Sequence, residues 1–161
     1  MPDDKTFPGQ DVVMQVCFVT DDLDATIARF SEVFDKAPVF IGGSPQGGTS
    51  DAVLRGKDVR VSYRQTLFRF DNIDVEFIEP GPEPSTWRET LDAKGPGFHH
   101  IAIGTRNMTR TTAWLGDRGL PMIQTGDYES RDGRYAYLDG AAVFGGVLEL
   151  LESFKDREAQ P

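Results

Sequence analysis

The chain has 161 residues, which is enough for one domain with a sizeable core or for two small fused modules. Its 39% hydrophobic and 27% charged content is typical of a soluble globular protein, and the net charge of −9 disfavours nucleic acid and anionic membranes as partners. A single cysteine, Cys17, a polar N-terminus and the absence of any run near ~18 apolar residues predict a cytoplasmic protein without membrane spans.

The first half of the chain predicts the order β-α-β-β-β. The strands are expected at Val12–Val19, Val39–Ile41, Val59–Phe70 and Ile73–Ile78. After the first strand, Asp21 or Asp22 can cap a helix whose apolar residues recur at i, i+4, i+7 and i+11. The glycine-rich run Gly42–Gly56 has no periodicity and is expected to be a mobile loop, whose role the sequence does not reveal.

The second half repeats this order after a proline-rich connector. Ser85 can cap a short helix that Gly95 ends. The strands are then expected at His99–Thr105, Met122–Thr125, Arg134–Leu138 and Val147–Leu151, with a helix at Met108–Leu115. A repeated unit of this kind indicates two modules.

The two halves match residue by residue when one is laid over the other. Gln15 coincides with His100 at an offset of 85 residues (100 − 15), and Glu76 coincides with Glu149 at an offset of 73 (149 − 76). The two offsets differ through loop lengths alone. The modules are placed at about 12–80 and about 98–152 of a single domain, 1–161.

Four polar residues that recur inside these apolar strands predict one metal site. Glu76 and Glu149 lie between branched or aromatic neighbours, and burying a lone carboxylate costs several kcal/mol unless a cation neutralises it. Gln15 and His100 add an amide oxygen and an imidazole nitrogen. Three oxygens and one nitrogen suit one divalent ion, namely zinc, manganese, cobalt or nickel, with iron(II) as a further candidate.

Simpler interpretations of single residues remain open. Glu79 and Glu152 flank loops and are expected at an edge or facing solvent, and an isolated Gln15 would be a satisfied core amide. Because strand residues alternate between faces, His99 is expected to pack or hydrogen-bond on the face opposite His100. The recurrence of polar residues at matching places in both halves favours the metal site.

Several segments resemble the vicinal oxygen chelate superfamily, and within it the glyoxalase I and methylmalonyl-CoA epimerase-like branch. They are Val75-Glu76-Phe77-Ile78-Glu79-Pro80, Gly97-Phe98-His99-His100-Ile101-Ala102-Ile103, Val147-Leu148-Glu149-Leu150-Leu151-Glu152, and the segment from Pro84 to His100 between the halves. The resemblance implies an α+β fold with two tandem βαβββ modules that form an open, cup-shaped mixed sheet around one divalent metal. The implied ligands are Gln15, Glu76, His100 and Glu149.

The resemblance also implies a metal-dependent enzyme that removes a proton next to a carbonyl and stabilises the enolate, as an isomerase, epimerase or lyase. The substrate would be a small oxygenated molecule or an acyl-CoA thioester, and Glu149, or else Glu76, would be the catalytic base. The epimerases carry a second carboxylate on the third strand of the first module. Here Val59–Phe70 contains no acid but carries Arg60 and Arg64, which are candidates for binding an anionic part of the substrate.

Two other functions use the same fold. A metal-free ligand-binding protein of the bleomycin-resistance type generally lacks the ligand set that this chain has. A ring-cleaving dioxygenase needs two histidines and one carboxylate on iron, which Gln15 and Glu76 disfavour. The family resemblance further implies that the chain forms a homodimer. It also implies that the ligand is a small-molecule substrate.

Overall fold

The computed structural model describes residues 5–44, 50–128 and 130–156. The strands are β1 (Gly9–Val19), β2 (Phe40–Ser44), β3 (Ser50–Leu54), β4 (Lys57–Val61), β5 (Tyr63–Arg69), β6 (Asp74–Pro80), β7 (Gly97–Thr105), β8 (Met122–Asp127), β9 (Gly133–Gly140) and β10 (Gly146–Ser153). The helices are α1 (Leu23–Phe34), α2 (Thr86–Lys94), α3 (Met108–Gly116), α4 (Ala141–Phe144) and the 3₁₀ turn η1 (Phe154–Asp156).

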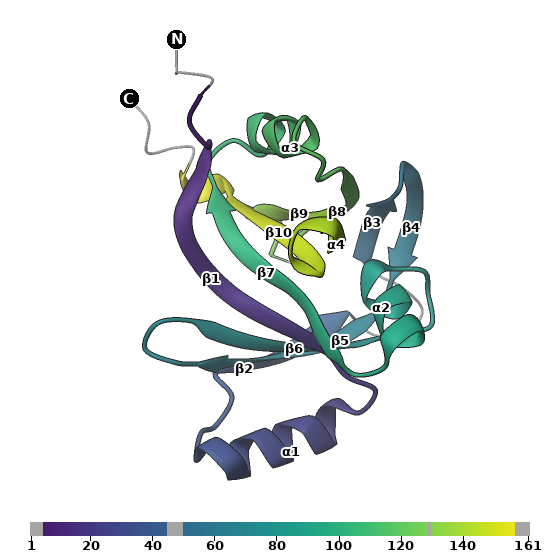
Figure 1. Ribbon diagram of the computed structural model, residues 1–161. Coiled ribbons are helices and arrows are strands. Elements are labelled where there is room, and N and C mark those ends of the chain that lie inside the picture. Colours follow the sequence, from purple (N-terminus) through teal and green to yellow (C-terminus); the bar gives the residue numbers. More distant parts are fainter. Residues whose placement is uncertain (1–4, 45–49, 129, 157–161) are drawn as a thin grey trace.

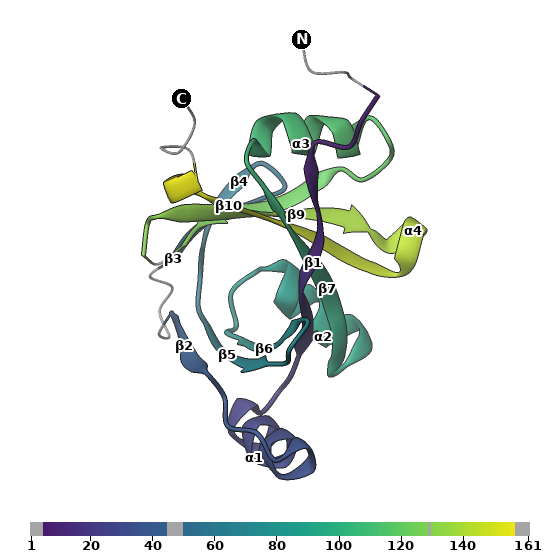
Figure 2. The ribbon, with the colours of Figure 1, turned by 90° about the vertical axis from the view of Figure 1, so that its left-hand side faces the viewer.

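These strands form a single sheet in the order β2-β5-β6-β1-β7-β10-β9-β8-β3-β4. The long strands β1 and β7 lie side by side in its middle (Figure 1), and the sheet curls so that β5 and β6 lie opposite β9 and β10 (Figure 2). The sheet is cup-shaped and nearly closed, which confirms the predicted α+β class. No helix of the described residues is long and apolar enough to cross a membrane.

The two halves are related by an approximate two-fold axis that passes between the central strands β1 and β7. They run antiparallel, with Gln15 opposite Ala102 and Cys17 opposite His100. Gln15 and His100 are 85 residues apart, and so are Cys17 and Ala102, so the axis exchanges the members of these pairs. The register is consistent with the offset of 85 residues between the two halves.

The flanking strands β6 and β10 follow the same symmetry. In β6, parallel to β1, Glu76 pairs with Cys17. In β10, parallel to β7, Glu149 pairs with Ala102. Both glutamates therefore lie one strand away from the central pair, at equivalent places.

Helices α1 and α3 both begin against a glutamate at the end of a strand. Glu79 Oε2 accepts a hydrogen bond from the backbone N–H of Leu23 at 2.6 Å, and Glu152 Oε1 accepts one from that of Met108 at 3.2 Å. Glu152 is fully buried and also pairs with Arg134 at 2.6 Å. The expectation that these glutamates face solvent is wrong, because their carboxylates satisfy helix N-termini, where the helix dipole stabilises negative charge.

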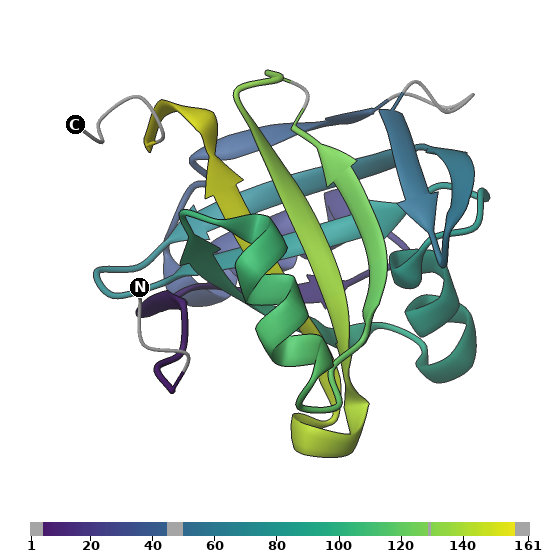
Figure 3. The ribbon, with the colours of Figure 1, turned by 90° about the horizontal axis from the view of Figure 1, so that it is seen from above.

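The helices cover the outside of the cup with apolar side chains. The ring of Phe30 in α1 lies 4.5 Å from that of Phe68 and 5.1 Å from that of Phe77, as the helical periodicity predicts. In the second half, α3 lies across the strands (Figure 3), and Met108 and Leu115 belong to a buried cluster with residues of β9 and β10. The helix caps are Asp22 for α1, Ser85 for α2 and Asn107 for α3.

The expectation of a mobile loop at Gly42–Gly56 is wrong for the part that is described, whereas 45–49 lie outside the described residues. Its first residues belong to β2 and its later ones form β3, where Ala52 and Leu54 are buried and Val53 is exposed. This alternation is a strand signal, and β3 is held by long-range pairing with β8, for example Val53 with Thr125.

The single strand expected at Val59–Phe70 is interrupted. The chain leaves β4 and enters β5 at Ser62, whose N–H and hydroxyl donate to Glu83 Oε2 at 3.2 and 2.5 Å. As a result β4 and β5 lie far apart in the sheet, and the hairpin β3–β4 extends the second half beyond β8 (Figure 3). This hairpin nearly closes the cup, and no repeat in the sequence predicts it.

Candidate metal centre

Two carboxylates and one imidazole converge where the two halves meet. Glu76 comes from β6, His100 from β7 and Glu149 from β10, and their exposed fractions are 7%, 0% and 5%. One ligand atom of each lies within 4.8 Å of those of the other two. The fold thus brings together three of the four residues that the sequence predicts as ligands.

The atoms at the centre lack ordinary partners. His100 Nε2 lies 3.0 Å from Glu149 Oε2 and 3.4 Å from Glu76 Oε2. His100 Nε2 and Glu149 Oε2 are buried, yet neither makes a hydrogen bond of good geometry. Leaving such groups unsatisfied costs about 1–3 kcal/mol each, and more when they are charged. An imidazole nitrogen and two carboxylates are donors that a divalent transition ion accepts, so these residues fit such an ion.

Gln15 lies on the wall of the adjoining cavity. It is half-buried on β1, and with Glu76 and Glu149 it lines a cavity of about 460 Å³. The fourth predicted ligand is therefore at the same cavity as the two glutamates.

Burial and close contact change the acidities at the centre. Burial alone would lower the pKa of His100, but the acidic groups of Cys17 and Glu149 raise it well above its usual value. Because burial raises the pKa of the Cys17 thiol, the thiol is neutral at neutral pH, and the Glu149 carboxylate is the charge that acts on the imidazole. Burial also raises the pKa of Glu149 against the opposing effect of His100. The pair therefore holds a proton more tightly than either group does in water.

Aromatic side chains form much of the cavity wall. Phe40, Tyr63, Trp87, Tyr128, Tyr135 and Tyr137 line it. Trp87 Nε1 donates to the hydroxyl of Tyr137 at 3.0 Å, and Tyr137 in turn hydrogen-bonds Glu149 and lowers its pKa against burial. The sequence analysis did not single out these residues, although Tyr135 and Tyr137 alternate along a strand as two residues of one face do.

The two arginines considered for substrate binding lie elsewhere. Arg64 forms an ion pair with Asp24 of α1 at 2.6 Å, on the outside of the cup. Arg60 lies 3.7 Å from Asp51 and lines a second cavity of about 820 Å³ near α3, which none of the four predicted ligands lines. The structure does not bring either arginine to the cavity of Glu76 and Glu149, and no lysine or arginine is among the described residues that line it.

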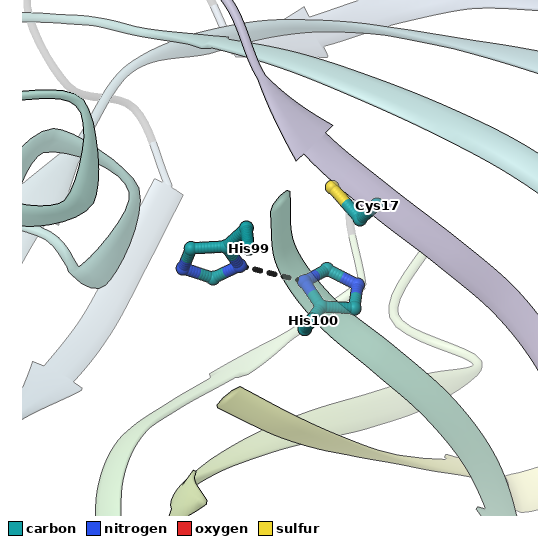
Figure 4. Close-up of side chains that lie close together, drawn as sticks. All are labelled: Cys17, His99 and His100. Atoms are coloured by element: carbon teal, nitrogen blue, oxygen red, sulfur yellow. Dashed lines mark hydrogen bonds between the residues drawn. The ribbon is translucent and has the colours of Figure 1, made fainter. Parts of the chain in front are cut away.

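His99 is the main departure from the expected alternation. Its side chain is buried, and its Nδ1 lies 2.7 Å from Nδ1 of His100 (Figure 4). Along the β1–β7 ladder Cys17 pairs with His100 and Phe18 pairs with Phe98, so His99 is an extra residue at a β-bulge. A bulge suspends the alternation of faces, which explains why two successive histidines contact each other.

Comparisons with known proteins agree with the fold. The family model of the Glyoxalase/Bleomycin resistance protein/Dioxygenase superfamily matches residues 14–138. Methylmalonyl-CoA epimerase from Mycobacterium tuberculosis superposes with a TM-score of 0.66 at 17% identity, over 92% of each chain. A hypothetical protein from Bacillus halodurans gives 0.66 at 17% identity, over 88% of this chain and 93% of the other.

A variant of methylmalonyl-CoA epimerase from Streptomyces coelicolor, in complex with 2-nitronate-propionyl-CoA, gives a TM-score of 0.64 at 22% identity. The match covers 88% of this chain and 96% of the epimerase. A search of curated proteins finds no sequence match.

Proposed function

Because this chain belongs to the Glyoxalase/Bleomycin resistance protein/Dioxygenase superfamily, we propose that it is a metal-dependent enzyme that removes a proton next to a carbonyl and stabilises the enolate. The reaction is an isomerisation or epimerisation, or else a lyase reaction, on an acyl-CoA thioester or another small oxygenated molecule. The observation that carries the proposal is the pair of buried atoms without partners, His100 Nε2 and Glu149 Oε2, beside Glu76. The epimerases of similar fold support the substrate class.

Four residues would hold the ion, namely Gln15, Glu76, His100 and Glu149. When bound, a divalent ion supplies a Lewis acid that stabilises the negative charge developing on a carbonyl oxygen. The two carboxylates neutralise the ion, and the aromatic wall of the cavity excludes water from the developing charge.

Glu149 is the proposed base. Burial raises its pKa, which brings the carboxylate closer to the range in which a general base works at neutral pH. The hydrogen bond from Tyr137, which itself accepts from Trp87, orients the carboxylate. Glu76 is the second candidate, since it lies on the other side of His100 Nε2 at 3.4 Å.

The stereochemical outcome depends on a second acid. Among the described residues that line the cavity, the carboxylates are those of Glu76, Glu149 and Asp127 of β8, and none comes from β4 or β5. A single base that takes and returns the proton on one face exchanges the hydrogen without inverting the carbon. Inversion requires an acid on the opposite face, and Asp127 is the third carboxylate among the described residues of the wall. Asp127→Asn should therefore abolish inversion but keep exchange.

The first experiment is a measurement of bound metal after the protein is stripped and reloaded with Zn, Mn, Co, Ni or Fe(II). We expect about one ion per chain, lost in Glu149→Gln and Glu76→Gln. Glu89→Gln, an exposed glutamate of α2, is the matched control and should bind metal like the unmodified chain.

The second experiment follows incorporation of deuterium from heavy water into methylmalonyl-CoA and propionyl-CoA, by mass spectrometry, with and without metal. Exchange that needs both the metal and Glu149 is the expected result. If no metal binds under any condition, the enzyme proposal fails, and the cavity is that of a metal-free binding protein of the bleomycin-resistance type.

A further inference from the structure

We propose that His99 is a positioning residue that accepts a hydrogen bond from Nδ1–H of His100 and so keeps His100 Nε2, the atom beside Glu76 and Glu149, as the nitrogen that binds a metal. The two Nδ1 atoms are 2.7 Å apart, which is a hydrogen-bond distance (Figure 4). The inference rests on the proposed metal centre. It adds a residue that lies outside the ligand set.

The direction of this hydrogen bond decides whether His100 can bind a metal. A neutral imidazole carries its proton on one nitrogen and a lone pair on the other. If His99 donated, His100 Nδ1 would be the acceptor and its proton would lie on Nε2, the atom 3.0 Å from Glu149 Oε2. If His99 accepts, Nε2 is free to bind. Metal-binding histidines commonly donate their other N–H to a neighbouring acceptor.

The proton of His99 then lies on its Nε2. This atom is buried and makes no hydrogen bond of good geometry, and the same is true of Thr86 Oγ1 at the start of α2. The backbone carbonyl of Thr86 is close enough to act on the His99 ring as an acceptor. Gln124 Oε1 fixes this turn by accepting from the Thr86 N–H at 2.9 Å. His99 Nε2 therefore lies beside the beginning of α2, with the Thr86 carbonyl as its candidate acceptor.

The backbone prepares this contact. His99 can reach His100 because it is the extra residue of the bulge in β7. The two-fold axis places a second bulge in β1, where Val13 pairs with Ile103 and Gln15 with Ala102, so that Met14 is the extra residue. Met14 is 42% exposed, whereas His99 is 1% exposed. Both halves have a bulge at this place. Only in the second half, whose proposed ligand is the imidazole of His100, is the extra residue a buried side chain that can accept a hydrogen bond.

A different use of the same residues is a second metal site. Ligand atoms of Cys17, His99 and His100 also lie within 4.8 Å of one another. Two nitrogens on one tetrahedral zinc, each at about 2.0–2.1 Å, would be separated by about 3.3 Å. The observed 2.7 Å is shorter and leaves no place for an ion between the rings. The geometry favours the hydrogen bond.

The test locates ring protons by long-range ¹H–¹⁵N NMR of protein labelled with ¹⁵N-histidine, metal-free and loaded with Zn²⁺. The chain has only two histidines, so His99→Asn and His99→Phe assign the signals. In both states we expect a proton on His100 Nδ1, none on His99 Nδ1 and one on His99 Nε2. A proton on His99 Nδ1 would overturn the proposal.

Zinc affinity, measured by chelator competition, provides the second readout. His99→Asn keeps an acceptor near the position of Nδ1, and we expect affinity within a few-fold of the unmodified chain. His99→Phe keeps a planar ring without an acceptor, and we expect a loss of about 10- to 100-fold. Equal affinity in a folded His99→Phe would refute the role.

If His99→Phe does not fold, the proposal is tested by the proton positions in the unmodified chain and by the zinc affinity of His99→Asn. If zinc binds nowhere, the metal proposal fails, while the metal-free spectrum still shows whether His99 accepts.

Discussion

Metal binding at this centre should release a proton, so metal affinity should fall as the pH falls. The His100–Glu149 pair, with its atoms at 3.0 Å and shielded from solvent, holds a proton that the ion must displace. While the pH stays below the raised pKa of His100, release of one proton changes the affinity about tenfold per pH unit, which is about 1.4 kcal/mol. Where the raised pKa of His100 lies above the assay range, a drop of two pH units, for example from pH 8 to pH 6, should lower the affinity about 100-fold.

The thermal stability of the protein reports this change. If zinc is set at about 100 times its dissociation constant at pH 8, binding stabilises the fold by about 2.7 kcal/mol, which raises Tm by about 5–11 °C for a chain of this length. At pH 6 the same zinc concentration equals the dissociation constant. The gain falls to about 0.4 kcal/mol, or about 1–2 °C.

The metal-free protein should show the opposite trend. The pKa values of His100 and Glu149 are both raised in the folded state, so the stability that this pair contributes is largest in acid and is lost as the pH rises through the folded values. Scanning calorimetry with and without zinc, together with an indicator dye for the released proton, measures both effects. A zinc-induced rise in Tm of equal size at pH 6 and pH 8, without proton release, would refute the reasoning.

Four further predictions concern the surroundings of the centre. Glu152→Gln should lower the free energy of unfolding in urea by about 3 kcal/mol, because Arg134 and the start of α3 lose a buried charge, whereas exposed Glu32→Gln should change it by less than about 0.5 kcal/mol. Trp87→Phe should cost about 1–3 kcal/mol, because the buried Tyr137 hydroxyl loses its donor. Arg64→Ala should change stability by less than about 1 kcal/mol and leave zinc affinity unchanged, since its ion pair is exposed. Cys17→Ala should cost about 1 kcal/mol and keep zinc affinity, whereas a tenfold loss would make the thiol a ligand.

The sequence predicts the parts of the fold that depend on local pattern and on repetition. The helix at α1 follows from its apolar periodicity, and the alignment of the halves predicts that Glu76 and Glu149 occupy equivalent places, as their pairing with Cys17 and Ala102 shows. The convergence of Glu76, His100 and Glu149 follows in turn, because a two-fold axis places equivalent strands together.

The remaining features depend on pairings between distant parts of the chain. The hairpin β3–β4 lies at the far edge of the sheet because Val53 pairs with Thr125. The alternation of buried and exposed residues along β3 predicts a strand, but it does not predict which edge of the sheet the strand joins. The interruption at Ser62 depends on Glu83, which lies in another segment. Charge alone makes Arg60 and Arg64 candidates for substrate binding and cannot tell this role from a solvated strand face, whereas in the structure Arg64 pairs with Asp24.

The two equivalent bulges carry different residues, a histidine (His99) beside His100 and a methionine (Met14) beside Gln15, and the chemistry of the two proposed ligands explains this difference. An imidazole offers a lone pair at Nε2 only when Nδ1 carries the proton, so a histidine ligand needs a neighbour that fixes this state. An amide oxygen always has lone pairs, so Gln15 needs no such neighbour. The equivalent bulge residues differ in the same sense, with buried His99 beside His100 and half-exposed Met14 beside Gln15. The symmetric backbone thus has an extra residue at the same place in each half, and the chemistry of the neighbouring proposed ligand accounts for the side chain at that place.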